Sequence, residues 1–207
     1  MRIEIHPAVP GRWDDVVDLF ERRGPRGAAQ FTAGCWCQYW HQRGKAFDPA
    51  HPEGNRERLR AQVEGGEEPG LLAYAHGVPV GWCRLGPRET FERLEHSPSL
   101  ARVDDEPVWS LVCFAVAPAA KRQGVASALL EGAVAHAAAQ GAPVLEAYAV
   151  PAGHHPVDSF TGYLPMFLAA GFEPVARRPR TVRTIVRRRL AKQQTVTRAG
   201  RRRGSTR

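Results

Sequence analysis

The apolar positions of the N-terminal half follow two different periods. Apolar and polar residues alternate over residues 2–7, which is the period of a half-buried strand. From Trp13 to Phe20 the apolar residues recur at helical spacing, and Gly24 follows as a stop signal. A short charged helix is expected over residues 55–64, and the two apolar runs of residues 71–86 predict a β-hairpin.

The C-terminal half is dominated by one apolar run and one alanine-rich segment. Residues 107–118 are almost continuously apolar, which predicts a central strand covered on both faces. The alanine-rich segment after it predicts a long helix that ends at Gly141. The remaining pattern predicts a strand, a short helix and a final strand, over residues 142–150, 162–172 and 181–190. We therefore expect a single α/β (α+β) domain over residues 1–190, with a mixed central sheet of about six to seven strands flanked by helices.

Composition indicates a protein with reduced thiols and no membrane-spanning segment. The four cysteines are too few for a disulfide scaffold, and the N-terminal residues have no apolar segment typical of a secretory signal. No run of about 18 apolar residues occurs, so no membrane partner is expected. These features predict a cytoplasmic location.

The formal net charge of +8 belongs to the C-terminal end. From Pro174 onward there are 13 Lys and Arg residues and no acidic residue, which leaves 16 basic against 21 acidic residues before it. Residues 191–207 are rich in Arg, Gln, Thr and Gly, and we expect them to form a basic disordered tail. Nucleic acid is not expected to bind the body of the domain and could be a partner only through this tail.

The segment with the clearest chemistry runs from the apolar strand into the alanine-rich helix. Gly124 and Ala126 lie where the helix opens, where unpaired backbone N–H groups and the helix dipole favour an anion such as phosphate. Small side chains there let an anion approach the N–H groups, while Lys121 and Arg122 add positive charge and Ser127 adds a hydroxyl. Neither a P-loop nor a dinucleotide fingerprint occurs, so the phosphate ligand is of another kind.

This segment resembles the acyl-CoA motif of the GNAT N-acetyltransferase superfamily. That motif, Arg/Gln-x-x-Gly-x-Gly/Ala, stands here as residues 121–126, with Lys121 at its first position. The preceding strand, the strand at 144–150 and the late segment MFLAAGFEPV also resemble the family, over roughly residues 3–190. The resemblance implies acetyl-CoA as the acyl donor and a primary amine, of a small molecule or exposed on a protein, as the acceptor. It implies this cofactor-binding set: Phe114, Ala115 and Val116 along the pantetheine arm, and Lys121, Arg122, Gln123, Gly124, Val125, Ala126 and Ser127 around the pyrophosphate.

The resemblance also implies direct attack of a neutral amine on the thioester. The tyrosine with which many family members protonate the leaving thiolate is replaced by Phe167, so we expect Tyr163, one helical turn earlier, to take that role. Without it, solvent would protonate the thiolate. For the base we expect Glu146, whose carboxylate would face the cleft from the strand at 144–150.

The stretch GCWCQYWHQRG, residues 34–44, can be interpreted in several ways. Its cysteines are separated by one residue, which is poor spacing for zinc or a disulfide, so we predict no metal site. On a helix, Trp36, Tyr39 and Trp40 would share one face. The family resemblance sets this segment beside the acceptor, so these three residues and Trp82 are expected to form a substrate wall or to support it.

Two other functions are compatible with the sequence. One is a non-catalytic acyl-CoA-binding or sensory module, because Phe167 replaces the usual tyrosine. The other is a nucleic-acid-associated protein that acts through its arginine-rich tail. The identity of the acceptor and the formation of a homodimer stay open.

Overall fold

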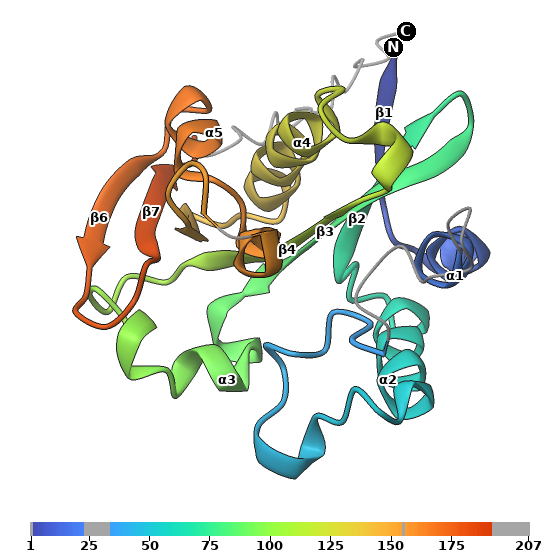
Figure 1. Cartoon of the computed structure of the whole chain (residues 1–207), viewed down its shortest axis with the longest axis horizontal. Helices are drawn as coiled ribbons and strands as arrows, with labels where there is room; N and C mark the ends of the chain where they lie inside the picture. The colour runs from blue at the N-terminus through green and yellow to red at the C-terminus, as the bar shows by residue number, and fades with distance from the viewer. Residues whose placement is uncertain (1, 23–33, 155, 192–207) are drawn as a thin grey trace, which may run out of the picture.

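The computed structural model describes residues 2–22, 34–154 and 156–191. The predicted tail, apart from Ala191, lies outside the described residues. Figure 1 shows one sheet with helices on both of its faces. No helix in the described part combines the length and the apolar character needed to cross a membrane.

The sheet confirms the prediction of a mixed sheet of six to seven strands. Its order is β1-β2-β3-β4-β5-β7-β6, and only the β4–β5 pair is parallel. The seven strands are β1 (Ile3–Pro7), β2 (Gly70–Ala75), β3 (Val78–Pro87), β4 (Trp109–Val116), β5 (Val144–Ala149), β6 (Glu173–Arg177) and β7 (Thr184–Arg189).

Five α-helices accompany these strands in the described part of the chain. They are α1 (Trp13–Glu21), α2 (Pro52–Glu64), α3 (Glu92–Glu95), α4 (Val125–Ala139) and α5 (Leu164–Ala169). In Figure 1, α4 and α5 lie on one side of the sheet, and α1, α2 and α3 lie on the other. Short 3₁₀ turns connect them, including η2 (Gly44–Ala46), η4 (Pro98–Leu100), η5 (Pro118–Ala120) and η6 (Pro156–Thr161).

The core is divided by the sheet. Under α4 and α5 the buried apolar side chains of β2, β3, β4 and β5 form one large cluster. On the opposite face, one cluster lies beneath α1 and α2 and another lies beneath α3. The central strand β4 is therefore covered on both faces, as its continuous apolar run predicts.

Close backbone contact fixes α4 against the sheet. A Cβ atom added to Gly81 of β3 would lie 2.7 Å from a methyl carbon of Val125, the first residue of α4. A Cβ added to Gly132, in the middle of the helix, would lie 2.6 Å from Ile5 of β1. The two glycines allow the helix to approach β3 and β1, and this sets where the N-terminus of α4 lies relative to β4.

Two local features differ from what the sequence pattern suggests. Residues 34–41 form successive turns rather than a helix, because Trp36 (φ 45°) and Cys37 (φ 52°) adopt left-handed backbone angles that a right-handed helix does not allow. The edge strand β6 was not expected. Its residues are mostly exposed and include Pro174, so it lacks the apolar alternation of a buried strand.

Candidate functional site

The main cavity lies where β4 and β5 diverge. The two strands pair only from Trp109 to Leu111, so the rest of β4 has no ladder partner on its β5 side among the described residues. A cavity of about 990 Å³ occupies this region and continues from the N-terminus of α4 to the aromatic residues around Tyr39 and Trp40. An open strand edge inside a cavity can pair with an extended ligand as an added strand would.

One end of the cavity is suited to an anion. The first helical N–H with a partner is that of Ala128, which donates to Gly124 O (2.9 Å), so the N–H groups of residues 125–127 precede the helical ladder. Arg122 (φ 60°) and Gly124 (φ 83°) both have left-handed angles, and such a turn directs successive N–H groups into one concavity. Oriented N–H groups and the helix dipole together favour a phosphate at this end.

Most of the predicted anion-binding residues line this end of the cavity. They are Lys121, Arg122, Gly124, Val125, Ala126 and Ser127. Gln123 does not line it, because its side-chain amide is exposed and donates to Ala119 O (2.8 Å). A Cβ at Gly124 would meet no atom within 4 Å, so it is the left-handed angle, and not a close protein contact, that requires glycine there.

The middle of the cavity is formed by β4. Phe114, Ala115 and Val116 line it, as the prediction for the pantetheine arm requires. Val112 is an extra residue in the β3–β4 ladder, since Arg84 pairs with Cys113 and Leu85 pairs with Leu111. This bulge turns the backbone of β4 just before the residues that line the cavity.

The predicted substrate wall divides into two parts. Tyr39 and Trp40 line the cavity together with Phe47 and Phe160, and the Tyr39 ring contacts Trp40 edge-on at 5.1 Å. Trp36 instead stacks on Phe20 (5.1 Å) in the core beneath α1.

Trp82 is fully buried in the same core as Trp36 and lines no part of the cavity. Tyr39 and Trp40 therefore line the cavity, whereas Trp36 and Trp82 pack in the core beneath α1.

Two thiols lie side by side in the wall next to these aromatic residues. The Sγ atoms of Cys37 and Cys113 are 3.3 Å apart, and the Trp82 indole N–H donates to Cys37 Sγ (3.2 Å). The hydrogen bond with Cys113, the nearby Arg84 charge and the Trp82 N–H lower the pKa of Cys37 despite its burial. All four cysteines are free thiols, and no three metal-ligating side chains within the described ranges could hold a metal ion together.

The charge beside these thiols belongs to Arg84, which is 1% exposed. Its Nε donates to His41 Nε2 (3.1 Å) and its Nη2 donates to Gln62 Oε1 (2.9 Å). Burial lowers the pKa of Arg84 to about 10, while burial and the arginine charge lower the pKa of His41 to about 3. His41 is therefore neutral, and the guanidinium acts on Cys37 with no described carboxylate hydrogen-bonded to it.

Glu146, expected as the general base, is fully buried and does not line the cavity. Its Oε1 accepts from Arg88 Nη1 (2.6 Å) and the Tyr148 hydroxyl (2.7 Å), and its Oε2 accepts from Arg187 Nε (2.8 Å). A carboxylate held by two arginines connects β5 to β7 and to the turn after β3. This geometry is that of a buried ion-pair network, and Glu146 is not among the described residues that line the cavity.

Tyr163, expected as the acid, lines the cavity. It precedes α5 in an extended conformation (φ −91°, ψ 139°) and forms a parallel bridge with Val150, so it is not part of the helix. Phe167 is fully buried, with its ring against Phe114 (6.2 Å) and Phe172 (5.3 Å). Of these two candidate positions, only the tyrosine is in contact with the cavity.

Carboxylates are missing from the described part of the cavity wall. No described Asp or Glu lines it, whereas Lys121, Arg122 and Arg183 do. The described polar side chains at this part of the wall include the thiols of Cys37 and Cys113 and the phenols of Tyr39 and Tyr163. Sequence patterns did not indicate Cys37 or Arg183, because their positions in the cavity depend on left-handed turns and on a distant strand.

Several solved structures with a similar fold are described as acetyltransferases. A Corynebacterium glutamicum protein named histone acetyltransferase HPA2 and related acetyltransferase is 20% identical, with a TM-score of 0.56 and coverage of 95% of this chain and 100% of its own. The Salmonella typhimurium protein yncA, solved with its cofactor acetyl-CoA, is 14% identical, with a TM-score of 0.54 and coverage of 92% and 95%. At these identities the likeness establishes the fold.

A third similar structure is the PaiA N-acetyltransferase from Thermoplasma acidophilum in complex with coenzyme A. It is 12% identical with a TM-score of 0.52, and the match covers 91% of this chain and 99% of that one. A search of curated proteins by sequence gave no match. The model of the acetyltransferase (GNAT) family matches residues 36–160, which is more than half of the chain. The chain therefore belongs to the GNAT acetyltransferase family.

Proposed function

We propose that this protein transfers the acetyl group of acetyl-CoA to a primary amine by direct attack. The observation that carries the proposal is the continuous cavity, which joins the N-terminus of α4, an open strand edge and an aromatic end. Acetyl-CoA has a pyrophosphate, an extended pantetheine arm and a terminal thioester in that same order. The similar structures from Salmonella typhimurium and Thermoplasma acidophilum, solved with acetyl-CoA and coenzyme A, support this choice of donor.

The residues present fit this donor. The N–H groups of residues 125–127 and the charges of Lys121 and Arg122 would hold the pyrophosphate. The unpaired edge of β4 at Phe114, Ala115 and Val116 would pair with the arm. The thioester would then lie toward the thiols and the aromatic residues, where it supplies an activated acetyl group.

Acetyl transfer at that end requires three things: a proton must leave the amine, charge on the carbonyl oxygen must be stabilised, and the thiolate must be protonated. The amine nitrogen bonds to the carbonyl carbon, the carbon–sulfur bond breaks, one proton leaves the nitrogen and one reaches the thiolate of coenzyme A. Tyr163 is the residue that we assign to protonate the thiolate, because its side chain lines the cavity. Backbone N–H groups on the unpaired edge of β4 could bind the carbonyl oxygen as its charge develops.

The proton from nitrogen has no carboxylate to accept it among the described lining residues. We assign its removal to solvent or to the Cys37 thiolate, whose lowered pKa keeps a larger thiolate fraction than an ordinary cysteine. An amine that enters the cavity already neutral needs least help, and the arginines of the wall disfavour an ammonium ion.

The experiment is a screen for thiol release. Purified protein is incubated with acetyl-CoA and a panel of primary amines, and free coenzyme A is measured with a thiol reagent after subtraction of acetyl-CoA hydrolysis. We expect release that depends on the amine, with kcat reduced about tenfold or more in Tyr163→Phe. Tight binding of acetyl-CoA with no release for any amine would contradict catalysis and favour the non-catalytic binding module.

A further inference from the structure

A second, smaller cavity adjoins the acceptor end of the main one. It has a volume of about 340 Å³ and lies between the turn at Arg43, α3, η4 and the residue before β7. Tyr39, Trp40 and Arg183 line both cavities, so the two share one wall. A molecule that occupies the aromatic end of the main cavity can therefore extend into the smaller one.

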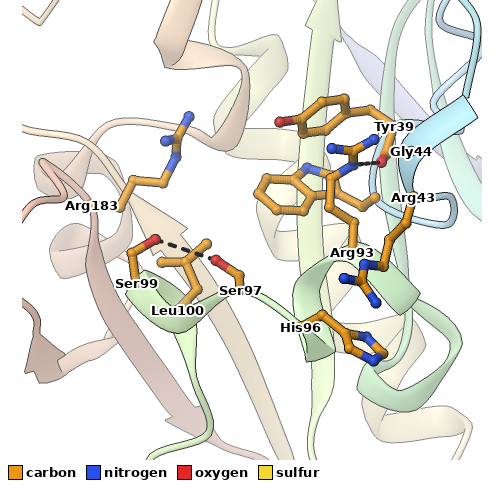
Figure 2. A pocket seen from close by; sticks show the side chains of 10 residues that line it. Tyr39, Arg43, Gly44, Arg93, His96, Ser97, Ser99, Leu100 and Arg183 are labelled. Carbon is orange, nitrogen blue, oxygen red and sulfur yellow. Dashed lines mark hydrogen bonds between the residues drawn. The ribbon is translucent and has the colours of Figure 1, made fainter.

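The lining of the second cavity is basic. Figure 2 shows Arg43, Arg93 and His96 on one side and Arg183 on the other, with Ser97 and Ser99 between them. None of its described lining residues is acidic, which matches the main cavity. The Arg43 side chain forms no hydrogen bond or ion pair with any described residue, so its charge is available to a ligand.

Arg93 is held in place by hydrogen bonds from its Nε alone, which leaves its two terminal amino groups without a bonded acceptor among the described residues. Its Nε donates to the carbonyl oxygens of Tyr39 (2.7 Å) and Gln42 (2.9 Å), and its guanidinium lies over the Tyr39 ring at 4.3 Å. A planar guanidinium fixed in this way is suited to bind two oxygens of a carboxylate or phosphate.

The indole N–H of Trp40 also points to a ligand, because it is a buried donor without an acceptor among the described residues. This residue is 6% exposed and lines both cavities. A buried donor without an acceptor is rare and costs free energy unless a ligand or water completes it. An oxygen atom of a ligand in the shared wall could accept this bond.

We propose that the amine acceptor carries an anionic group, a carboxylate or a phosphate, which binds in the smaller cavity between Arg43, Arg93 and Arg183. This inference rests on the proposed function and specifies its substrate class. The anionic group would anchor the molecule, while its amine reaches past Tyr39 and Trp40 toward the thioester. The nearby arginine charges also favour the neutral form of that amine, which is the form that attacks.

The test compares acceptors that differ only in the anionic group. Thiol release is measured with acetyl-CoA and matched pairs: ethanolamine against O-phosphoethanolamine, and propylamine against β-alanine. We expect kcat/KM to be at least tenfold higher for the anionic member of one or both pairs. The phosphate pair and the carboxylate pair distinguish the two kinds of anion.

Arg43→Met is the diagnostic variant, because the Arg43 side chain has no partner to lose among the described residues. We expect it to raise KM for the preferred anionic amine about tenfold, to leave KM for its neutral counterpart within twofold, and to change kcat little. Arg43→Lys should restore part of the affinity. Lys45→Met is the matched control, since it removes an exposed positive charge two residues away that lines neither cavity.

The outcomes separate this inference from the proposed function. If no amine of either class releases coenzyme A, the proposed function is wrong. If neutral amines react as well as their anionic counterparts, acetyl transfer stands but the anion site is wrong. Equal effects of Arg43→Met and Lys45→Met would also contradict the site, because they would reflect only the general surface charge.

Discussion

Glu146→Gln distinguishes a structural carboxylate from a catalytic one. The wild-type carboxylate is fully buried and accepts from Arg88, Arg187 and Tyr148 at 2.6–2.8 Å. The amide keeps one acceptor oxygen, but its NH₂ group must face an arginine that is also a donor. The loss of one partner from a buried ion pair costs about 3–5 kcal/mol.

We expect a cost near the lower end of that range. Arg88 keeps its bonds to Glu95 (2.6 Å) and to Leu100 O (2.8 Å), and Arg187 keeps its bond to Asp104 (2.7 Å). A loss of about 3 kcal/mol corresponds to a fall in melting temperature of roughly 6–12 °C for a chain of this size. Urea denaturation of wild type and variant, with an unchanged m value, measures the loss directly.

Activity of the same variant completes the test. Below its unfolding transition, Glu146→Gln should keep kcat/KM within about threefold of wild type, whereas loss of a general base costs about 10²–10⁴-fold. Glu64→Gln removes the same charge from an exposed pair with Arg60 and should change little. Wild-type stability combined with a hundredfold loss of activity would refute the structural role and restore Glu146 as the base.

Three further predictions follow from the contacts around the cavities. Burial holds the pKa of His41 near 3 against about 6.5 in the unfolded chain, so the unfolded state binds the extra proton between these values. The free energy of unfolding should therefore fall as pH drops below 6.5, by up to about 1.4 kcal/mol per pH unit from this residue. His41→Gln should flatten this dependence of unfolding free energy on pH. Equal pH dependence in wild type and variant would contradict the prediction. Iodoacetamide near pH 8 should alkylate Cys37 before Cys35, because burial raises the pKa of Cys35 to about 11 while the pKa of Cys37 is lowered. Acetyl-CoA should slow the alkylation of Cys37. Peptide mass spectrometry that finds Cys35 modified first would contradict this prediction. Phe167→Tyr restores the tyrosine common in the family but places a hydroxyl between the rings of Phe114 and Phe172. It should therefore lower the free energy of unfolding by about 1–3 kcal/mol without raising kcat. A higher kcat would show that this position reaches the thioester.

The order of elements and the glycine turn before α4 could be predicted because both depend on local pattern. The apolar run of β4, the alanines of α4 and the glycine at position 124 lie within one continuous segment, and each follows from nearest-neighbour chemistry. The same holds for the β2–β3 hairpin, whose turn uses His76 and Gly77 at positive φ. Such features need no knowledge of distant contacts.

The side chains at the aromatic end of the cavity depend on tertiary structure and could not be predicted in the same way. Trp36 and Cys37 adopt left-handed angles, so the helical spacing assumed for residues 34–41 assigned Trp36 and Tyr39 to one face that the chain does not form. Arg43, Arg93 and Arg183 come from three distant segments and meet only through the fold. The two arginine partners of Glu146 lie 58 and 41 residues away, so its burial could not be inferred from β5 alone.

We propose that the cavity lined by Gly124 binds acetyl-CoA through the N-terminus of α4. Isothermal titration calorimetry with acetyl-CoA tests it on wild type, Gly124→Val and Gly141→Val. Both glycines have similar positive φ values (83° and 80°) and open space where a Cβ atom would lie, but only Gly124 lines the cavity. The backbone strain should therefore be similar at the two positions. We predict that Gly124→Val weakens binding at least tenfold while Gly141→Val binds as wild type does; absent binding in wild type, or equal affinity in all three proteins, would contradict the account.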